Sequence, residues 1–246
     1  MFSSDKKKAA AFDYEGGDLE AMAQAEKYYE WLAATMEPYL GKDIVEVGAG
    51  VGSFSKLLRS TKPATLTLLE PAKRMYDLLV KNVKSNKKTI VKGYSDYLKG
   101  VEEKLKKNQP DTFVYINVFE HIEDDVAELK RIKNILQKDG HAIIFVPAMQ
   151  VLYSEFDKSI GHYRRYDKQM LTELANKAGM DVVKIRYMDM PGMLPWWLSF
   201  VLMKRKGLMP KMVKIYDAFC VPIIRAFETV IEPPVGKNVL LVAKKR

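Results

Sequence analysis

The sequence has little cysteine, little histidine and no long apolar run. One cysteine in 246 residues, Cys220, excludes a disulfide within the chain and is typical of a reducing compartment, so we expect a cytoplasmic protein. With three histidines, acid–base chemistry near neutral pH has few candidates. The N-terminal MFSSDKKKAA has no apolar core, so we expect no signal peptide. The longest nearly uncharged apolar stretch, 193–203, is shorter than the ~20 residues that span a bilayer.

Charge does not single out a partner. Lysine and arginine outnumber aspartate and glutamate by 40 to 31, which gives a net charge of +9, but the basic residues are dispersed in short runs. Dispersed lysines are typical of a solvated surface, and no recognisable RNA- or DNA-binding module accompanies them. We therefore expect no nucleic-acid partner. The 48% apolar and 29% charged residues are ordinary for a soluble domain with one core.

Helical and strand patterns alternate along the chain. A helix is predicted at 167–178, where Asp167 can cap the start and Gly179 the end. Further helices are predicted at 18–37, between Asp18 and Pro38, and at 124–137. Apolar strands are predicted at 43–48, 65–70, 88–92, 111–117, 141–147, 181–188 and 238–245. This alternation predicts an α/β, Rossmann-like doubly wound sheet with helices on both faces and ligands at the carboxyl ends of its strands.

We expect a single domain over 1–246 with four parts. These are an N-terminal helical cap (1–40), a cofactor-binding core (41–189), a helical insertion or lid (190–234) and the last strand (235–246). The insertion is set apart by its methionines and by its position just before the last strand.

Three glycines lie within five positions after the first predicted strand, in EVGAGVG at 46–52. Such a break usually lets the backbone pass close to a nucleotide-like ligand. The dinucleotide fingerprint G-x-G-x-x-G has glycine or alanine at the position where Ser53 stands, and here the third glycine comes one place early. The spacing therefore disfavours a dinucleotide.

Two acids accompany the glycine loop. Glu46 would be unfavourable beside a pyrophosphate but favourable beside the ammonium of a methionine moiety. Glu70 ends the next predicted strand, about 20 residues past the loop, where an acid can accept hydrogen bonds from both ribose hydroxyls. Together the two acids favour S-adenosylmethionine as the ligand.

With these residues in place, the chain resembles the class I S-adenosylmethionine-dependent methyltransferases over nearly its whole length. The resemblance is most specific in VEVGAGVGSFSKLL, INVFEHIEDDVAELKRI and VPAMQVLYSEFDKSIGHYRRYDKQMLTEL. The first resembles the family's cofactor loop, and the second resembles small-molecule methyltransferases related to quinone-pathway O-methyltransferases. The third is similar to a subgroup described only as a methyltransferase domain. The resemblance implies a seven-stranded sheet with an antiparallel last strand. It also implies S-adenosyl-L-methionine over the first two strands, with S-adenosyl-L-homocysteine as product.

Cofactor contacts are expected where the first four strands end. Backbone amides of Gly48, Ala49 and Gly50 can approach the donor because two of the three residues lack a side chain. Ser95 and Asp96 are candidate partners of the adenine amino group, although Asp96 could equally cap the next helix. The expected cofactor residues are Glu46, Gly48, Ala49, Gly50, Gly52, Glu70, Pro71, Ser95, Asp96, Asn117 and Val118.

Two histidines are candidate catalytic residues. His121 follows the fourth predicted strand and His162 follows the fifth, so both are expected at the carboxyl edge of the sheet. His141 opens the fifth strand at the opposite edge. A neutral imidazole can take the proton from a hydroxyl or amine that attacks the sulfonium methyl group. For His121 and His162 alike, a structural hydrogen bond is the alternative role.

A divalent metal ion is considered because Glu120, His121, Glu123 and Asp124 are clustered and the quinone-pathway relatives can use one there. Two adjacent ligands on one turn rarely point at one metal, and acids also suit a helix N-terminus. We expect no metal.

The loop GHYRRY, 161–166, is expected to hold the acceptor. Arg164 and Arg165 are permanently charged planar donors that suit a carboxylate or phosphate. The alternative is that one arginine pairs with an acid such as Asp157 while the other is solvated. The expected acceptor residues are Tyr153, Tyr163, Arg164, Arg165, Tyr166 and Trp196.

The insertion, 190–234, is rich in methionine and carries Trp196 and Trp197. Such a surface adapts to apolar partners, and a tryptophan pair beside lysines can lie at a lipid interface. The sequence leaves open whether the insertion is a lid, a homodimer interface, a peripheral membrane contact or a hairpin packed on the core.

We therefore expect a methyltransferase that acts on a small, anionic and partly apolar acceptor. The alternative is a nucleic-acid or protein methyltransferase, although INVFEH lacks the N-P-P-Y type motif of base-amino methylation and no recognition domain is evident. A nicotinamide-dependent oxidoreductase is disfavoured by the glycine spacing.

Overall fold

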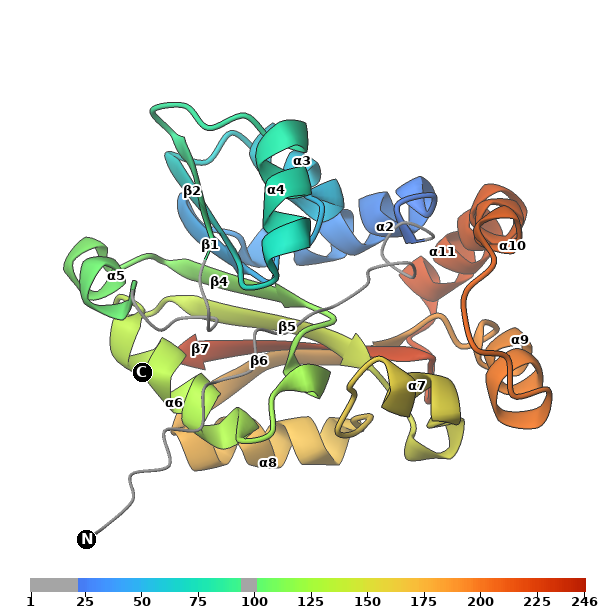
Figure 1. The fold of residues 1–246 in the computed structure, drawn as a ribbon. Coiled ribbons are helices and arrows are strands. Elements are labelled where there is room, and N and C mark those ends of the chain that lie inside the picture. Colours follow the sequence, from blue (N-terminus) through green and yellow to red (C-terminus); the bar gives the residue numbers. More distant parts are fainter. Residues whose placement is uncertain (1–21, 94–100) are drawn as a thin grey trace, which may run out of the picture.

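Seven strands form one sheet in the computed structural model, which describes residues 22–93 and 101–246 (Figure 1). Their order across the sheet is β3-β2-β1-β4-β5-β7-β6. The strand β7 runs antiparallel to both of its neighbours, and the other neighbouring pairs are parallel. This confirms the predicted doubly wound sheet with an antiparallel last strand. The strands are β1 (Asp43–Val47), β2 (Thr65–Glu70), β3 (Thr89–Gly93), β4 (Thr112–Ile116), β5 (His141–Pro147), β6 (Met180–Met188) and β7 (Asn238–Lys245).

Each predicted strand is confirmed to within one residue at either end. The central strands are apolar on both faces, and their neighbouring side chains enter different layers of the core. Ile44 lies in one apolar cluster and Val45 in the other. Because both faces are buried, these strands appear in the sequence as continuous apolar runs rather than as alternating patterns.

Helices cover both faces of the sheet (Figure 1). One face packs against α2 (Glu26–Met36), α3 (Ser53–Ser60), α4 (Lys73–Asn82) and α11 (Val221–Val230). The other packs against α5 (Glu102–Asn108), α6 (Asp125–Ile135) and α8 (Lys168–Ala178). The core is therefore two apolar layers separated by the sheet.

The predicted ends of α8 are confirmed. The carboxylate of Asp167 accepts a hydrogen bond from the Met170 amide at 2.7 Å, and Gly179 ends the helix with a left-handed φ of 72°. The predicted helix 18–37 appears as α2, followed by the short turn η1 (Glu37–Tyr39). Its expected cap, Asp18, lies outside the described residues.

The predicted helical insertion is confirmed as two helical stretches. The first is α9 (Met193–Trp196) with the π-helical η4 (Trp197–Leu202), and the second is α10 (Pro210–Ile215), the π-helical η5 (Tyr216–Cys220) and α11. They gather beyond the carboxyl end of β5 (Figure 1). Three short elements lie at the same edge of the sheet: η2 (Phe119–His121), η3 (Gln150–Leu152) and α7 (Glu155–Ser159). Within residues 22–93 and 101–246, no helix is long and apolar enough to cross a membrane.

Candidate active site

A cavity of about 340 Å³ opens at the carboxyl ends of β1, β2 and β4. Its walls come from the glycine loop, η2, the GHYRRY loop, α2 and the insertion. Parallel strands end at one edge of a sheet, so segments far apart in the sequence meet there. The expected cofactor residues that line it are Gly48, Gly50, Glu70, Pro71, Asn117 and Val118.

The glycine loop needs glycine for its backbone conformation and for its closeness to the segment that follows β4. Gly48, Gly50 and Gly52 have φ values of 72°, 55° and 86°, a region that other residues rarely adopt. A Cβ atom on Gly48 would lie 2.4 Å from a methyl carbon of Val118. The loop can therefore turn beneath the cavity only while these side chains are absent.

The loop amides are bonded within the protein. The amides of Gly48 and Ala49 both donate to the Leu69 carbonyl, at 2.8 and 3.0 Å, and the Gly50 amide donates to Oε2 of Glu70 at 2.7 Å. We expected these amides to approach the donor directly. All three already donate within the protein, so the structure does not support a hydrogen bond from them to the donor. Ala49 and Gly52 also lie off the cavity wall.

Glu70 combines support of the loop with access to the cavity. Its carboxylate accepts from the Gly50 amide and, at 2.8 Å, from the Ala72 amide. Burial raises its pKa from the ordinary value, against the effect of these two hydrogen bonds. Each carboxylate oxygen accepts one backbone hydrogen bond and can accept another, so Glu70 can still receive the hydroxyls of a ribose.

Glu46 lies beneath the loop rather than on the cavity. It is buried, it accepts a hydrogen bond from the Ser55 hydroxyl at 2.5 Å, and it does not line the cavity. Burial raises its pKa to about 8. The expected contact with the methionine ammonium is therefore not supported, because the side chain points into the protein and favours its neutral form.

Asn117 faces the cavity from the end of β4 with a left-handed φ of 54°. Its buried Oδ1 has no hydrogen-bond donor among the described residues. A buried carbonyl oxygen without a donor costs free energy, so this atom fits a ligand that donates, such as an ammonium. Glu70 and Asn117 together fit the donor's polar groups. Ser95 and Asp96, the expected adenine contacts, lie outside the described residues.

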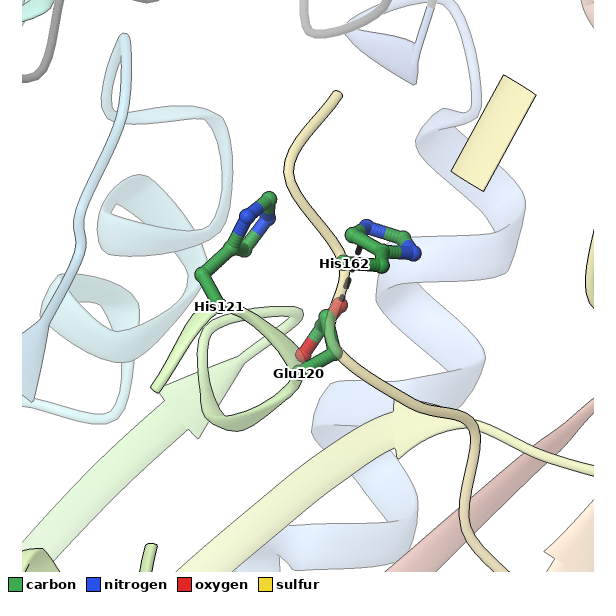
Figure 2. A group of neighbouring side chains, drawn as sticks. All are labelled: Glu120, His121 and His162. Carbon is green, nitrogen blue, oxygen red and sulfur yellow. Dashed lines mark ion pairs between the residues drawn. The ribbon is translucent and has the colours of Figure 1, made fainter. Parts of the chain in front are cut away.

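Three titratable side chains meet on the cavity wall: Glu120, His121 and His162 (Figure 2). Nε2 of His162 lies 3.8 Å from Oε1 of Glu120, and the two imidazole rings are 4.7 Å apart. Glu120 is fully buried, and neither of its carboxylate oxygens has a hydrogen-bond partner among the described residues. Burial raises the pKa of Glu120 to about 7 and lowers that of His121 to about 3.

The same three side chains could hold a metal ion, since one ligand atom from each lies within 4.8 Å of the others. We argued from the sequence that the adjacent Glu120 and His121 would not point at one metal. In the structure both residues lie on η2 with His162 close by (Figure 2), so their adjacency in the sequence does not by itself keep their ligand atoms apart. The absence of a metal stays an expectation.

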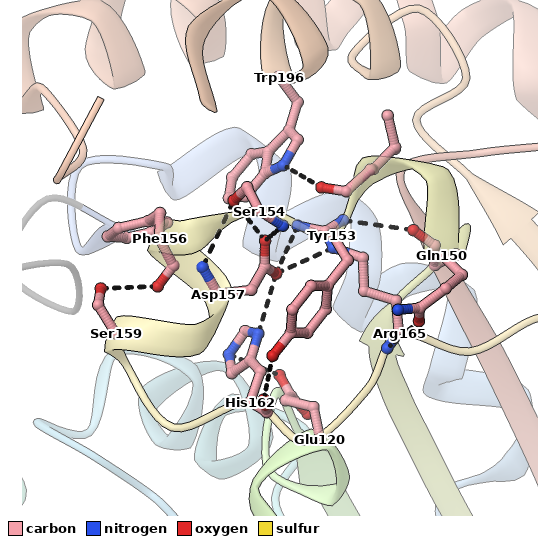
Figure 3. Close-up of polar contacts among 12 residues, drawn as sticks. Glu120, Gln150, Tyr153, Ser154, Phe156, Asp157, Ser159, His162, Arg165 and Trp196 are labelled. Carbon is pink, nitrogen blue, oxygen red and sulfur yellow. Dashed lines mark hydrogen bonds and ion pairs between the residues drawn. The ribbon is translucent and has the colours of Figure 1, made fainter. Parts of the chain in front are cut away.

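Asp157 connects the GHYRRY loop to α7 (Figure 3). Its Oδ1 lies 3.1 Å from Nδ1 of His162, and it accepts from Nε and Nη2 of Arg165 at 2.9 and 2.7 Å. Its Oδ2 accepts from the amide and hydroxyl of Ser154. Burial acts to raise the pKa of Asp157, but these hydrogen bonds and the Arg165 charge hold it below the ordinary value. An ionised Asp157 accepts a hydrogen bond from Nδ1–H of His162, and in that tautomer Nε2 can accept a proton.

The two arginines of the loop have different surroundings. Arg165 is 1% exposed, lines the cavity, pairs with Asp157 and lies 4.7 Å over the ring of Trp196. Arg164 is off the cavity and forms a 2.7 Å ion pair with Asp125. A role of Arg164 in anchoring the acceptor is therefore not supported. The alternative considered from the sequence, an ion pair between one of the arginines and Asp157, is formed by Arg165.

The three tyrosines also lie off the cavity wall. Tyr153 donates to the His162 carbonyl at 2.7 Å, Tyr163 is 52% exposed, and Tyr166 is buried with its hydroxyl 2.9 Å from Asp125. The expected contact of these tyrosines with the acceptor is therefore not supported. The side chains of His162 and Arg165 reach the cavity, whereas those of the three tyrosines do not. Trp196 does line the cavity.

A further part of the cavity wall, formed by Tyr28, Tyr216 and Lys237, was not predicted from the sequence. Lys237 pairs with Asp189 at 2.6 Å and lies over the rings of Tyr28 and Tyr216, at 5.2 and 5.4 Å. Tyr28, Tyr216 and Lys237 line the cavity. They come from α2, η5 and the segment before β7, and no local motif links them. The one available signal was the helical periodicity of α2, in which Tyr28 lies on the buried face with Trp31 and Leu32.

Comparison with known proteins identifies the family and the fold. A family model described as a methyltransferase domain matches residues 21–185. No curated protein matches the chain. The structure is similar to a SAM-dependent methyltransferase of Thermotoga maritima described as a possible histamine N-methyltransferase, at 17% identity and TM-score 0.58, over 93% of this chain and 94% of that chain.

Two further solved structures share the fold. One is a SAM-dependent methyltransferase of Archaeoglobus fulgidus, at 16% identity and TM-score 0.56, over 88% of this chain and 94% of that chain. The other is phosphoethanolamine N-methyltransferase 2 of Haemonchus contortus in complex with S-adenosyl-L-methionine. It is 14% identical with TM-score 0.62, over 99% of this chain and 61% of that chain.

Proposed function

This chain belongs to the methyltransferase-domain family, whose methyl donor is S-adenosyl-L-methionine, and we propose that His162 acts as the base when the methyl group passes to a small, partly apolar acceptor. The observation that carries this proposal is the contact between Asp157 and Nδ1 of His162, which leaves Nε2 on the cavity as a proton acceptor. The nucleophile is then a protic group, such as a hydroxyl or an amine, because such a group must lose a proton when it is methylated.

Donor binding is assigned to the end of the cavity nearest β1 and β2. The bound donor supplies a methyl group made electrophilic by its sulfonium. Glu70 accepts hydrogen bonds from the ribose, and Oδ1 of Asn117 accepts from the ammonium. The glycines keep this end of the cavity open, and their amides hold the loop to β2 and to Glu70.

Proton removal is assigned to His162 and Glu120. Nε2 of His162 takes the proton as the acceptor's oxygen or nitrogen attacks the methyl carbon. Asp157 balances the imidazolium charge, and Oε1 of Glu120, 3.8 Å away, can receive the proton afterwards. A carboxyl with a pKa of about 7 suits that role near neutral pH.

The acceptor's apolar part is matched by three neighbouring aromatic rings on the cavity wall. Phe200 lies 4.8 Å from Phe156 and 4.4 Å from Trp196, and all three line the cavity. The anionic part is better matched at the mouth than at the GHYRRY loop. Arg165 and Lys237 are neutralised by buried acids, whereas Arg205 lines the cavity and has no acidic partner among the described residues.

The test is methyl transfer from labelled S-adenosyl-L-methionine to fractionated cell extract. Label in small-molecule or lipid products, lost in His162→Ala, supports the proposal. Label in RNA or protein would instead establish the alternative acceptor class. Tight binding of NADH with no binding of S-adenosyl-L-homocysteine in calorimetry would contradict the donor site altogether.

A further inference from the structure

The insertion has an outer surface that is apolar over much of its length. The side chains of Phe219 and Phe227 are 70% and 68% exposed, and Leu202 is 58% exposed. Met203, Met212 and Ile223, which belong to the same two helical stretches, are also exposed. Exposed apolar side chains gathered on one segment are costly in water and mark a binding surface. We call residues 194–231 the insertion surface.

Every exposed charge within the insertion surface is basic. Lys204, Arg205, Lys206, Lys211 and Lys214 are exposed. The two acids of this segment, Asp217 and Glu228, are buried at 6% exposure each. Glu232, the next residue of the insertion, is exposed but pairs with Lys168 and Lys184 of the core. The basic side chains of the insertion surface therefore have no exposed acid among residues 194–231 to neutralise them.

Both acids are directed into the protein. Asp217 accepts from the Lys27 and Tyr28 amides of α2, and Glu228 accepts from the Asp189 and Met190 amides. These bonds fasten the insertion to the core. They also determine which side of its helices stays outside.

The mouth of the cavity lies within the insertion surface. Arg205, Met209 and Met212 are exposed and also line the cavity. A molecule held against the insertion surface would therefore have a direct path to the aromatic wall formed by Phe156, Trp196 and Phe200.

We propose that the insertion surface binds an anionic lipid bilayer and that the cavity takes its acceptor from that membrane. The proposal rests on the proposed function and specifies the source of its acceptor. Apolar side chains enter the interface, the basic side chains contact anionic headgroups, and Arg205 meets the acceptor's anionic group at the mouth. The contact is peripheral, since no described helix could cross a bilayer.

The test is co-sedimentation of the full chain with two kinds of vesicle. One is phosphatidylcholine alone, and the other contains phosphatidylglycerol as one lipid in three. We expect binding to the anionic vesicles to be about tenfold or more tighter, and to weaken as salt rises. Equal binding to both vesicles, or to neither, would overturn the proposal.

Matched variants separate the insertion surface from the general basicity of the protein. Lys204→Glu with Lys206→Glu should weaken vesicle binding about tenfold or more, whereas Lys104→Glu with Lys107→Glu, exposed at α5, should not. Phe219→Ser with Phe227→Ser should also weaken it, and Val183→Ser on β6 should not.

Size-exclusion chromatography decides between a membrane and a second copy of the chain. The wild type could be a dimer that the double variant Phe219→Ser with Phe227→Ser converts to a monomer. If that variant also binds vesicles as the wild type does, the insertion surface is a dimer interface and the proposal is overturned. Binding of S-adenosyl-L-homocysteine without vesicles reports on the proposed function separately. Retained cofactor binding and His162-dependent transfer without vesicle binding would contradict the membrane proposal alone.

Discussion

Oδ1 of Asp157 lies 3.1 Å from Nδ1 of His162 and also pairs with Arg165. The histidine and the arginine are three residues apart in one loop and meet at a carboxylate from α7. This arrangement orients the imidazole and keeps its orienting group charged. From the sequence we expected the GHYRRY loop to supply both a catalytic histidine and an acceptor-binding arginine, and in the structure His162 and Arg165 share one carboxylate on the cavity wall.

His162→Ala should remove most of the activity and leave the cofactor site intact. Activity should fall because loss of a general base costs roughly 10²- to 10⁴-fold in rate. Cofactor binding should persist because His162 makes no contact with the glycine loop. The measurement is kcat together with the dissociation constant of S-adenosyl-L-homocysteine. His141→Ala, at the opposite edge of the sheet, is the control and should retain activity. A His162→Ala protein with full activity would show that His162 is not the general base.

Arg165→Met should destabilise the protein far more than Arg164→Met. Arg165 is 1% exposed, and its removal leaves Asp157 buried without its charge partner, which costs about 3–5 kcal/mol. The pair between Arg164 and Asp125 is partly solvated, so its loss should cost about 1 kcal/mol. Urea unfolding gives both free energies, and equal losses would contradict the difference in environment.

Glu70→Ala should weaken binding of S-adenosyl-L-homocysteine by about 1–3 kcal/mol, the range for hydrogen bonds to a charged group. Part of the loss comes from the Gly50 and Ala72 amides, which lose their acceptor. Glu46→Gln is the matched control, because Glu46 is buried beneath the same loop without reaching the cavity. Calorimetry should find its affinity unchanged. A loss of affinity in Glu46→Gln would instead support the contact between Glu46 and the methionine ammonium that we expected from the sequence.

Glu120→Gln should stabilise the protein at alkaline pH. Burial raises the pKa of Glu120 from 4.5 to about 7, so between these values the unfolded chain releases a proton that the folded protein keeps. Stability from this group is therefore full below pH 4.5 and falls as the pH rises to about 7. The loss is at most about 3 kcal/mol. Unfolding at pH 5 and pH 8 should show a smaller pH dependence in the variant than in the wild type.

Removal of divalent ions should leave methyl transfer unchanged, because His162 is assigned as a base and not as a metal ligand. The measurement is activity after extensive chelation and after re-addition of zinc or magnesium. Activity that disappears on chelation and returns with one of these ions would instead assign Glu120, His121 and His162 as its ligands.

Much of the fold could be read from local patterns. Strands buried on both faces are apolar runs, the cap at Asp167 and the stop at Gly179 are local hydrogen-bonding and backbone features, and all were predicted closely. The glycine loop was also evident, since left-handed backbone after a strand requires glycine. Because a parallel sheet places its strand ends at one edge, the sequence also indicated where the site would lie.

The direction of individual side chains at that edge was decided only by tertiary structure. Arg164 and Arg165 are neighbours of the same type, yet Asp125 of α6 draws one away from the cavity while Asp157 and Trp196 hold the other on it. Irregular loops have no periodicity that assigns a face to each residue. The sequence by itself therefore determined the sheet, the glycine turn and the edge that carries the site. Contacts between distant segments determined which side chains reach the cavity, because each partner is brought into place only when the whole core packs.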